Sequence, residues 1–344
     1  MHRVRHGAAV SALVLAAGLG ASGCALRPQD CSRSSVRCAG LVTDFGPVDE
    51  GLSQEAWLAL LDARAAGMID RADFIETVDT RDREANITAF GEQGYDIIVT
   101  VGAGMADETI AVAQKYPDLR FIGVQQSPVV RPELSNFVAL VFHEEESGFL
   151  AGAAAGLITR TDRVAAVCEV SFIDSIRRYC EGFRAGAKHV DPEIRVKVAH
   201  RTGSQELLFR DVEWSQAAAV LELDRGTDVV FAVGYDTADA ALAAAAVRGA
   251  LVIGAETDAY GRLPEIRPQL VTSAILDVRS GLLTLIRDIA HGWFRAGEYW
   301  GRVSLAPWHE SEGRIAPEAI ARLQEIASDL ESGAIKVNVP FDGP

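Results

Sequence analysis

The chain has 344 residues, a formal net charge of −15 and a hydrophobic content of 49%. This length is enough for two domains with cores of their own, and the composition is that of a globular protein. The acidic balance argues against binding to nucleic acid, because phosphate groups repel a strongly negative protein. Small neutral or cationic ligands remain compatible with it.

Residues 1–24 predict an export signal. Arg3 and Arg5 precede an apolar run at 8–21, which is too short to span a membrane as a stable helix. Small residues then lead directly into Cys24 and resemble a lipobox, the site at which bacterial lipoproteins are diacylated and cleaved. We therefore expect lipidation at Cys24 and attachment to a membrane surface through acyl chains. The alternative is an ordinary cleaved signal with an incidental cysteine. Either reading places the mature chain outside the cytoplasm, on the periplasmic or cell-surface side.

Four further cysteines remain: Cys31, Cys38, Cys168 and Cys180. In an oxidising compartment four cysteines can pair in three ways, and the local pairings, Cys31 with Cys38 and Cys168 with Cys180, are the simplest. Free buried thiols are the alternative. The sequence holds no CxxC motif, so it predicts neither a zinc knuckle nor a redox site of the thioredoxin type.

The folded part is expected to begin after a polar tether at residues 25–38. Residues 39–43 form a short apolar run that predicts a strand, and residues 44–47 follow as a turn. Ser53 can cap a helix. The expected apolar face of that helix carries Trp57, Leu60, Leu61 and Ala65.

An internal repeat is the strongest evidence for the architecture. Residues 95–102 and residues 227–234 each predict a buried strand that ends in glycine. An alanine-rich helix follows in both copies, and then a second short strand that ends in Ile-Gly. Each copy is therefore a βαβ unit. Strands without polar alternation indicate sheets covered on both faces, so the predicted fold is α/β with two doubly wound lobes.

The ligand crevice of an open parallel sheet lies outside the carboxyl ends of its strands. The loops after Gly102 and Gly234 lie at those ends, so they line one cleft if the two lobes face each other. Neither copy carries GxGxxG, and the chain has no GxxxxGK[ST] motif. A phosphate-binding loop is therefore not supported.

These segments resemble the basic membrane protein family of bacterial lipoproteins, whose best-known members are nucleoside-binding proteins of ABC transporters. The likeness covers most of residues 40–300, and order and spacing both agree. The segments that carry it are 41–50, 56–57, 94–96, 115–118, 121–123, 142–152, 177–187 and 271–273.

The resemblance implies a type I periplasmic-binding-protein fold, in which two lobes joined by three crossover strands close on ligand like a hinge. Crossovers are expected near 136–141, near 271–275 and close to the C-terminus. Lobe 1 would comprise residues 39–138 and 272–303. Lobe 2 would comprise residues 139–271 and 304–344. The helix 279–293 would return to lobe 1.

The sequence departs from the family in the residues that touch ligand. The phenylalanine expected to stack on a nucleobase is missing from the first loop, and Phe45 is its possible substitute. The second-lobe loop of the Gly-Ser-Phe type is replaced by residues 203–206, and Phe209 or Trp214 could reach the cleft instead. Leu276 stands where the family has lysine, whereas Asp258 matches an acidic position associated with ribose hydroxyls. The predicted ligand-binding residues are Asp44, Phe45, Asp49, Gly102, Met105, Asp107, Gly234, Tyr235, Asp236, Glu256 and Asp258.

Several of these residues also have a purely structural interpretation. Asp44 can cap its own turn, and Asp107 sits near a helix start, where a carboxylate is favoured by the helix dipole. The segment 306–315 diverges from the family and has no functional interpretation.

The leading hypothesis is an exported, lipid-anchored solute-binding protein that captures a nucleoside-like ligand for an ABC permease. Such a protein performs no reaction and needs no cofactor or metal, and a monomer is expected. A ligand-sensing or regulatory lipoprotein without a transport role is one alternative. An exported nucleoside hydrolase is another, against which the missing clusters of metal ligands count.

Overall fold

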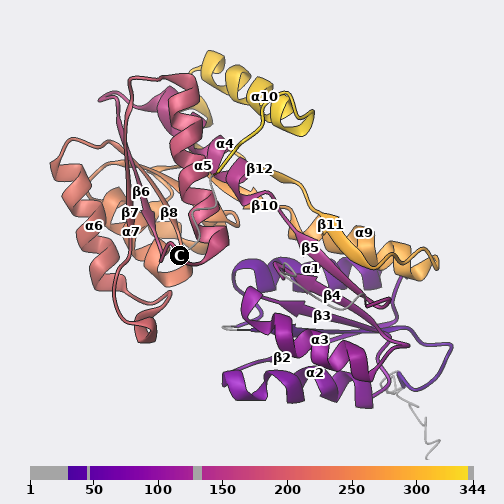
Figure 1. Ribbon diagram of the computed structural model, residues 1–344. Helices are drawn as coiled ribbons and strands as arrows, with labels where there is room; N and C mark the ends of the chain where they lie inside the picture. Colours follow the sequence, from indigo (N-terminus) through magenta and orange to yellow (C-terminus); the bar gives the residue numbers. More distant parts are fainter. Residues whose placement is uncertain (1–29, 45–46, 127–133, 340–344) are drawn as a thin grey trace, which may run out of the picture.

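The computed structural model describes residues 30–44, 47–126 and 134–339, which form two lobes joined by crossing strands (Figure 1). The predicted export signal, 1–24, and its lipidation site Cys24 lie outside the described residues. In the described part of the chain, none of the helices combines the length and the apolar character that a membrane crossing requires.

The sheet of lobe 1 is entirely parallel and has six strands. In spatial order they are β11 (Gly297–Trp300), β5 (Phe137–Val141), β4 (Arg120–Val124), β3 (Ile97–Val101), β1 (Cys38–Thr43) and β2 (Arg71–Glu76). Every residue of β1, β3 and β5 is buried, as expected for strands covered on both faces.

The sheet of lobe 2 also has six strands, and all its pairs are parallel except the edge pair of β10 and β12. In spatial order they are β12 (Val303–Leu305), β10 (Leu270–Leu276), β9 (Leu251–Glu256), β8 (Val229–Val233), β6 (Arg163–Cys168) and β7 (Arg195–His200). The two sheets have equivalent orders apart from their edge strands β11 and β12.

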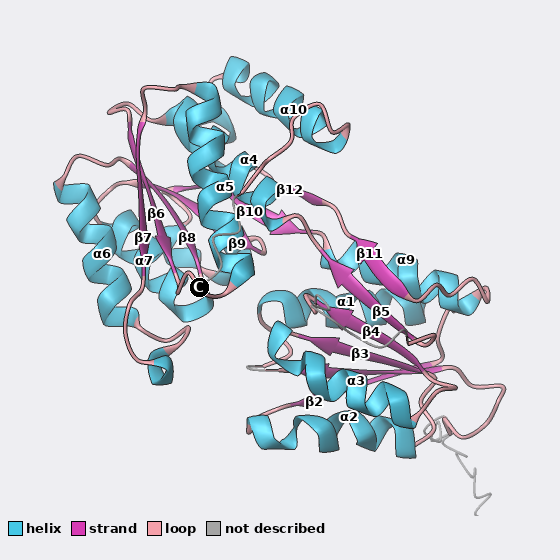
Figure 2. Ribbon diagram, in the orientation of Figure 1, coloured by secondary structure: helices cyan, strands magenta, loops and turns pink. Residues whose placement is uncertain are grey.

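Helices cover both faces of the lobe 1 sheet (Figure 2). One face packs against α1 (Gly51–Ala65) and α9 (Val278–Ala290), and the other against α2 (Arg83–Glu92) and α3 (Ala106–Lys115). The contact of α9 with α1 confirms that the predicted helix after residue 278 returns to lobe 1.

The first helix differs from its prediction. It begins at Gly51 after Glu50, so Ser53 lies inside the first turn and does not cap the helix. Its buried residues are Leu52, Ser53, Ala56, Ala59, Leu60 and Ala63, and of the predicted apolar face only Leu60 is among them. Small alanines rather than Trp57 form this face because α9 packs closely against it.

Lobe 2 has the same layering. One face of its sheet packs against α4 (Glu144–Ile158) and α5 (Asp174–Val190), and the other against α6 (Val212–Asp224) and α7 (Tyr235–Val247). The short α8 (Ala259–Arg262) follows β9, and α10 (Pro317–Glu331) lies on α4.

Both copies of the predicted repeat fold alike, which confirms the βαβ units and the α/β fold class. The first is β3, α3 and β4, and the second is β8, α7 and β9. The glycine after the first strand has a positive φ in both copies, 114° at Gly102 and 126° at Gly234. Such a backbone is open to glycine and rare for other residues, so the sequence signal has a direct steric cause.

The lobe boundaries lie a few residues from those predicted. The chain leaves lobe 1 after β5 at residues 142–143, returns at 277 after β10, and leaves again at 301–302 between β11 and β12. The expected boundaries at 138, 271 and 303 would have cut through β5, β10 and β12, respectively. Each strand instead stays in one sheet because it pairs along its length with a neighbour.

The cysteines form the two local disulfides, Cys31–Cys38 and Cys168–Cys180. The first one corrects the predicted extent of the tether, 25–38. Cys31 and Cys38 are both buried in the core of lobe 1, and Cys38 is the first residue of β1. The folded part therefore starts by residue 31.

Candidate ligand-binding site

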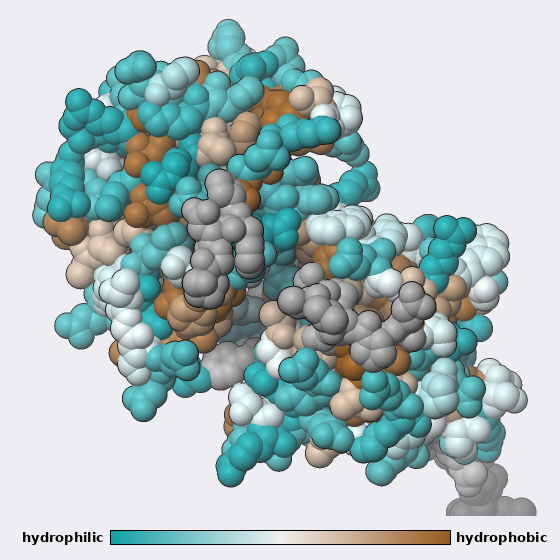
Figure 3. Space-filling model, in the orientation of Figure 1, coloured by the Kyte–Doolittle hydropathy of each residue, from teal (hydrophilic) through white to brown (hydrophobic). Residues whose placement is uncertain are grey.

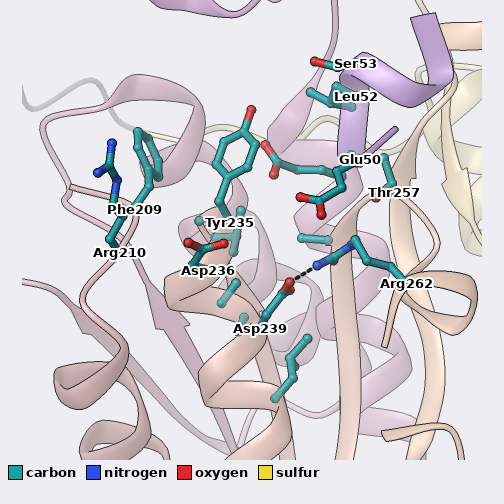
Figure 4. Close-up of a pocket in the computed structure, with 18 of the residues that line it drawn as sticks. Glu50, Leu52, Ser53, Phe209, Arg210, Tyr235, Asp236, Asp239, Thr257 and Arg262 are labelled. Carbon is teal, nitrogen blue, oxygen red and sulfur yellow. Dashed lines mark hydrogen bonds and ion pairs between the residues drawn. The ribbon is translucent and has the colours of Figure 1, made fainter. Parts of the chain in front are cut away.

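A cavity of about 370 Å³ lies between the lobes and is lined by residues of both (Figure 4). The space-filling view in Figure 3 shows the two lobes as separate masses with a recess between them. Lobe 1 supplies the turn before α1 and its first residues, and lobe 2 supplies the ends of β8 and β9, the start of α7, the end of α8 and the loop at 209–210. The lining residues are Pro47, Glu50, Gly51, Leu52, Ser53, Phe209, Arg210, Ala232, Val233, Gly234, Tyr235, Asp236, Ala238, Asp239, Leu242, Ala255, Glu256, Thr257 and Arg262.

The lobe 2 wall is built around the turn from β8 into α7. A Cβ at Gly234 would lie 2.7 Å from the Cβ of Glu169, so the turn leaves no room for another residue there. Tyr235 comes next, with a φ of 49°, and its side chain is 41% exposed. Its ring meets that of Phe209 edge to face, with centroids 5.2 Å apart and planes at 79°. Two aromatic side chains thus lie together in the cavity, as Figure 4 shows.

A buried carboxylate holds this wall in place. Glu169 follows β6 and is fully buried with Arg201, to which it is ion-paired. Its other oxygen accepts hydrogen bonds from the Phe209 amide, at 3.0 Å, and the Thr237 hydroxyl, at 2.8 Å. One side chain therefore fixes both the aromatic loop and the first turn of α7.

Glu256 ends β9 beside these aromatic residues, with a φ of 67°. Burial raises the pKa of Glu256 to about 7, and Gln125 of lobe 1 opposes the shift. Gln125 follows β4, also with a positive φ, 56°, and the two residues lie at corresponding strand ends of the two lobes.

Arg262 is ion-paired with Asp239, as the dashed line in Figure 4 shows. Glu50 of lobe 1 and Asp236 of lobe 2 also act on Arg262 electrostatically, although neither contacts it in a hydrogen bond. Among the described residues, no hydrogen bond or ion pair uses the carboxylate of Glu50 or of Asp236. These two carboxylates are available to a ligand.

Asp44 follows β1 in lobe 1 and lies beside the cavity rather than in its lining. It is ion-paired with Arg83, which donates to the Gly104 carbonyl at 2.8 Å and lies 3.9 Å from Glu108. Burial raises the pKa of Asp44, against the opposing effect of Arg83. A Cβ at Gly102 would lie 2.6 Å from the Cβ of Asp44, which is why glycine is needed there.

The structure brings four of the predicted ligand-binding residues into the cavity lining: Gly234, Tyr235, Asp236 and Glu256. Phe45 lies outside the described residues. Of its possible substitutes, Phe209 lines the cavity, whereas Trp214 packs in a separate hollow between α6 and β7.

The remaining predictions are placed elsewhere. Met105 is fully buried in the core of lobe 1, because the turn after Gly102 points its side chain inward. Asp107 is exposed in the first turn of α3, and Asp49 is exposed before α1. Asp258 caps α8 by accepting from the Tyr260 amide, and its second oxygen contacts His309 at 2.7 Å. Both carboxylate oxygens of Asp258 therefore have partners within the protein.

The contact of Asp258 with His309 also gives the divergent segment 306–315 a structural role. His309 stacks on Tyr260, with ring centroids 3.9 Å apart, and Glu310 accepts a hydrogen bond from the Tyr260 hydroxyl. The segment therefore packs on the loop after β9 and holds it.

Sequence reasoning missed Glu50, Arg262 and Glu169. Glu169 could have been found from the repeat, because it follows β6 as Asp44 follows β1. In the part of the chain described here, no group of three or more His, Cys, Asp or Glu side chains could hold a metal ion.

Comparison with known proteins agrees with this geometry. Residues 40–302 match the family described as ABC transporter substrate-binding protein PnrA-like. The chain belongs to this family. Its match spans most of both lobes and all three points at which the chain passes between them.

Individual relatives are distant. The ABC transporter nucleoside-binding protein BmpA of Lactococcus lactis is 29% identical over 65% of this chain and 63% of its own length. A purine-binding protein of Brucella abortus is 23% identical over 79% of this chain and 73% of its own. The fold is that of a solute-binding protein from Aeropyrum pernix, with a TM-score of 0.73 at 20% identity over 89% of this chain and 94% of the other. The type I periplasmic-binding-protein fold is therefore confirmed.

Proposed function

We propose that this member of the family binds a nucleoside-like ligand in the cavity between its lobes and delivers it to an ABC permease, without chemical change. The observation that carries the proposal is the shared lining. Glu50, Leu52 and Ser53 come from lobe 1, and Tyr235 and Glu256 from lobe 2, so a bound ligand would contact both lobes. A ligand that contacts both lobes favours their closed arrangement, which a permease can distinguish from the open one.

The chemistry of the lining suits a nucleoside. Tyr235 and Phe209 offer aromatic surface to a planar base. The carboxylates of Glu50 and Asp236 are strong acceptors for ribose hydroxyls. A volume of about 370 Å³ lies within the ~300–1,000 Å³ range of small-molecule sites. The related nucleoside-binding and purine-binding proteins support the same ligand class.

Thermal stability with a ligand panel tests the proposal. Mature protein would be melted with nucleosides, free bases, sugars and amino acids. A ligand at one hundred times its Kd stabilises the folded state by about 2.7 kcal/mol, a shift of several degrees. We expect the shift with nucleosides and its loss in Tyr235→Ala. The control is Trp293→Ala, which removes a 66% exposed aromatic outside the cavity. No shift with any nucleoside, or one that survives in Tyr235→Ala, would contradict the proposal.

We also propose that the protein is exported and anchored by acyl chains on Cys24, as a monomer. The basis is the sequence of residues 1–24. Cys24→Ser should move the protein from the membrane fraction to the soluble exported fraction, with ligand binding unchanged. Equal membrane association of the Cys24→Ser variant and the native protein would refute the anchor and leave ligand binding untouched.

A further inference from the structure

The cavity carries an excess of negative charge. Its lining includes four carboxylates, Glu50, Asp236, Asp239 and Glu256, and two guanidinium groups, Arg210 and Arg262. Asp239 and Arg262 neutralise each other in an ion pair. Between the lobes, where water is partly excluded, uncompensated charges act more strongly than they do at an open surface.

The aromatic residues lie among these carboxylates. Tyr235 is adjacent in sequence to Asp236, and Glu256 acts electrostatically on the Tyr235 side chain. A planar ligand stacked on Tyr235 would therefore lie close to two carboxylates. A cation over an aromatic face gains roughly 0.5–2 kcal/mol, and nearby carboxylates add to this attraction. A neutral ring would receive the stacking term alone.

We propose that the preferred ligand is a cationic nucleoside, one whose base carries a positive charge, as base-methylated nucleosides such as 1-methyladenosine do at neutral pH. The inference rests on the proposed function and specifies the ligand class of the same site. Tyr235 and Phe209 contact the charged base, and the carboxylates of Asp236 and Glu50 supply the compensating charge. The same carboxylates exclude nucleotides, because their phosphates are anionic.

Two isomeric nucleosides and one nucleotide test this preference by isothermal titration calorimetry at neutral pH. They are 1-methyladenosine, which is cationic, N6-methyladenosine, which is its neutral isomer, and adenosine 5′-monophosphate, which is anionic. We expect 1-methyladenosine to bind at least tenfold more tightly than N6-methyladenosine, and the nucleotide to bind most weakly. Equal or weaker binding of the cationic isomer would overturn the inference.

Charge-removing variants test whether these carboxylates cause the preference. Glu50→Gln combined with Asp236→Asn should lower the ratio of the two affinities severalfold, mainly by weakening 1-methyladenosine. Neither carboxylate has a hydrogen-bond or ion-pair partner among the described residues, although both act electrostatically on Arg262, so a thermal melt of the double variant checks that its fold is kept. The matched control is Glu318→Gln, which removes an exposed carboxylate at the start of α10. A ratio unchanged in the double variant would refute the assignment.

The outcomes separate this inference from the proposed function. Tight binding of neutral nucleosides without preference for the cationic isomer leaves the proposed function standing and removes the inference. No binding of any nucleoside, charged or neutral, removes both. Binding of the cation that persists in Tyr235→Ala shows that charge is recognised away from the aromatic wall, which also overturns the inference.

Discussion

The two lobes place an acidic residue at the same point of their sheets, and they use it differently. Asp44 follows β1 and Glu169 follows β6, and each pairs with an arginine that also approaches a second carboxylate. In lobe 2 the pair of Glu169 and Arg201 is fully buried. In lobe 1 the side chains of Asp44 and Arg83 keep 17% and 18% exposure.

The difference lies in what else each carboxylate holds. Glu169 accepts from Phe209, Thr237 and Val170, so it fixes the aromatic wall of the cavity. In lobe 1, Nε of Arg83 and one oxygen of Glu108 lack a hydrogen-bond partner, whereas in lobe 2 only Nη2 of Arg201 does among the atoms of the corresponding described cluster. The pair of Glu169 and Arg201 is therefore a buried support in lobe 2, whereas the pair of Asp44 and Arg83 in lobe 1 is more open.

The largest predicted effect comes from breaking the buried pair. Arg201→Met leaves the Glu169 carboxylate buried without its counter-ion, which should lower the free energy of unfolding by ~3–5 kcal/mol. Denaturant titration measures the change. The double variant Arg201→Met with Glu169→Gln should recover part of the loss, because no uncompensated charge remains. A loss below 1 kcal/mol in Arg201→Met would show that the pair is not the support described here.

The two disulfides extend the comparison between the lobes. Cys168–Cys180 joins residues 12 apart in lobe 2, next to Glu169, and Cys31–Cys38 joins residues 7 apart in lobe 1. Loop-closure entropy predicts losses of about 2.8 and about 2.4 kcal/mol when each pair is replaced by serine. Thermal melts of the two double-serine variants check the order. A larger loss from Cys31 and Cys38 would contradict it.

A third comparison concerns two corresponding strand ends, Gln125 directly after β4 and Glu256 at the end of β9. The folded-state pKa of Glu256, about 7, lies above the ordinary glutamate value of 4.5. The folded state therefore binds more protons than the unfolded state between these values, and stability should fall as pH rises from about 4.5 to 7.

Glu256→Gln isolates this contribution from that of Glu144, whose pKa burial also raises to about 7. The Glu256→Gln variant should show a smaller fall in melting temperature over this pH range. It would also place a glutamine at the end of β9, as Gln125 stands after β4 in lobe 1. Melting curves at several pH values, for the native protein and the variant, measure the difference. Parallel pH profiles would contradict the assignment to Glu256.

The sequence could predict the fold because its signals are local. Buried apolar runs followed by Gly102 and Gly234 identify the two βαβ units, since a positive φ at each turn requires glycine. The crossovers were misplaced by a few residues because hydrogen bonding along a whole strand, rather than local composition, decides where β5 and β10 end.

The site could be predicted only in part, because its side-chain partners are distant in sequence. Tyr235 and Asp236 were found through the repeated turn. The pairing of Asp258 with His309 spans 51 positions, and it removes from the cavity a residue that the family resemblance had placed there. Glu50 comes from lobe 1 and Arg262 from lobe 2. No sequence pattern predicts that these two residues line the same cavity.

The smallest effect is expected from Arg83→Met, the lobe 1 counterpart of Arg201→Met. The Asp44 and Arg83 side chains keep 17% and 18% exposure, so loss of this arginine should cost less than loss of the fully buried Arg201. Asp44 also acts electrostatically on Tyr235, so the freed carboxylate should make the lobe 1 side of the cleft more negative. We therefore expect Arg83→Met to strengthen binding of a cationic nucleoside while Arg201→Met weakens it by releasing the Phe209 loop. Calorimetric affinities of the two variants measure this opposition, and a change of the same sign in both would mean that the two clusters serve the lobes alike.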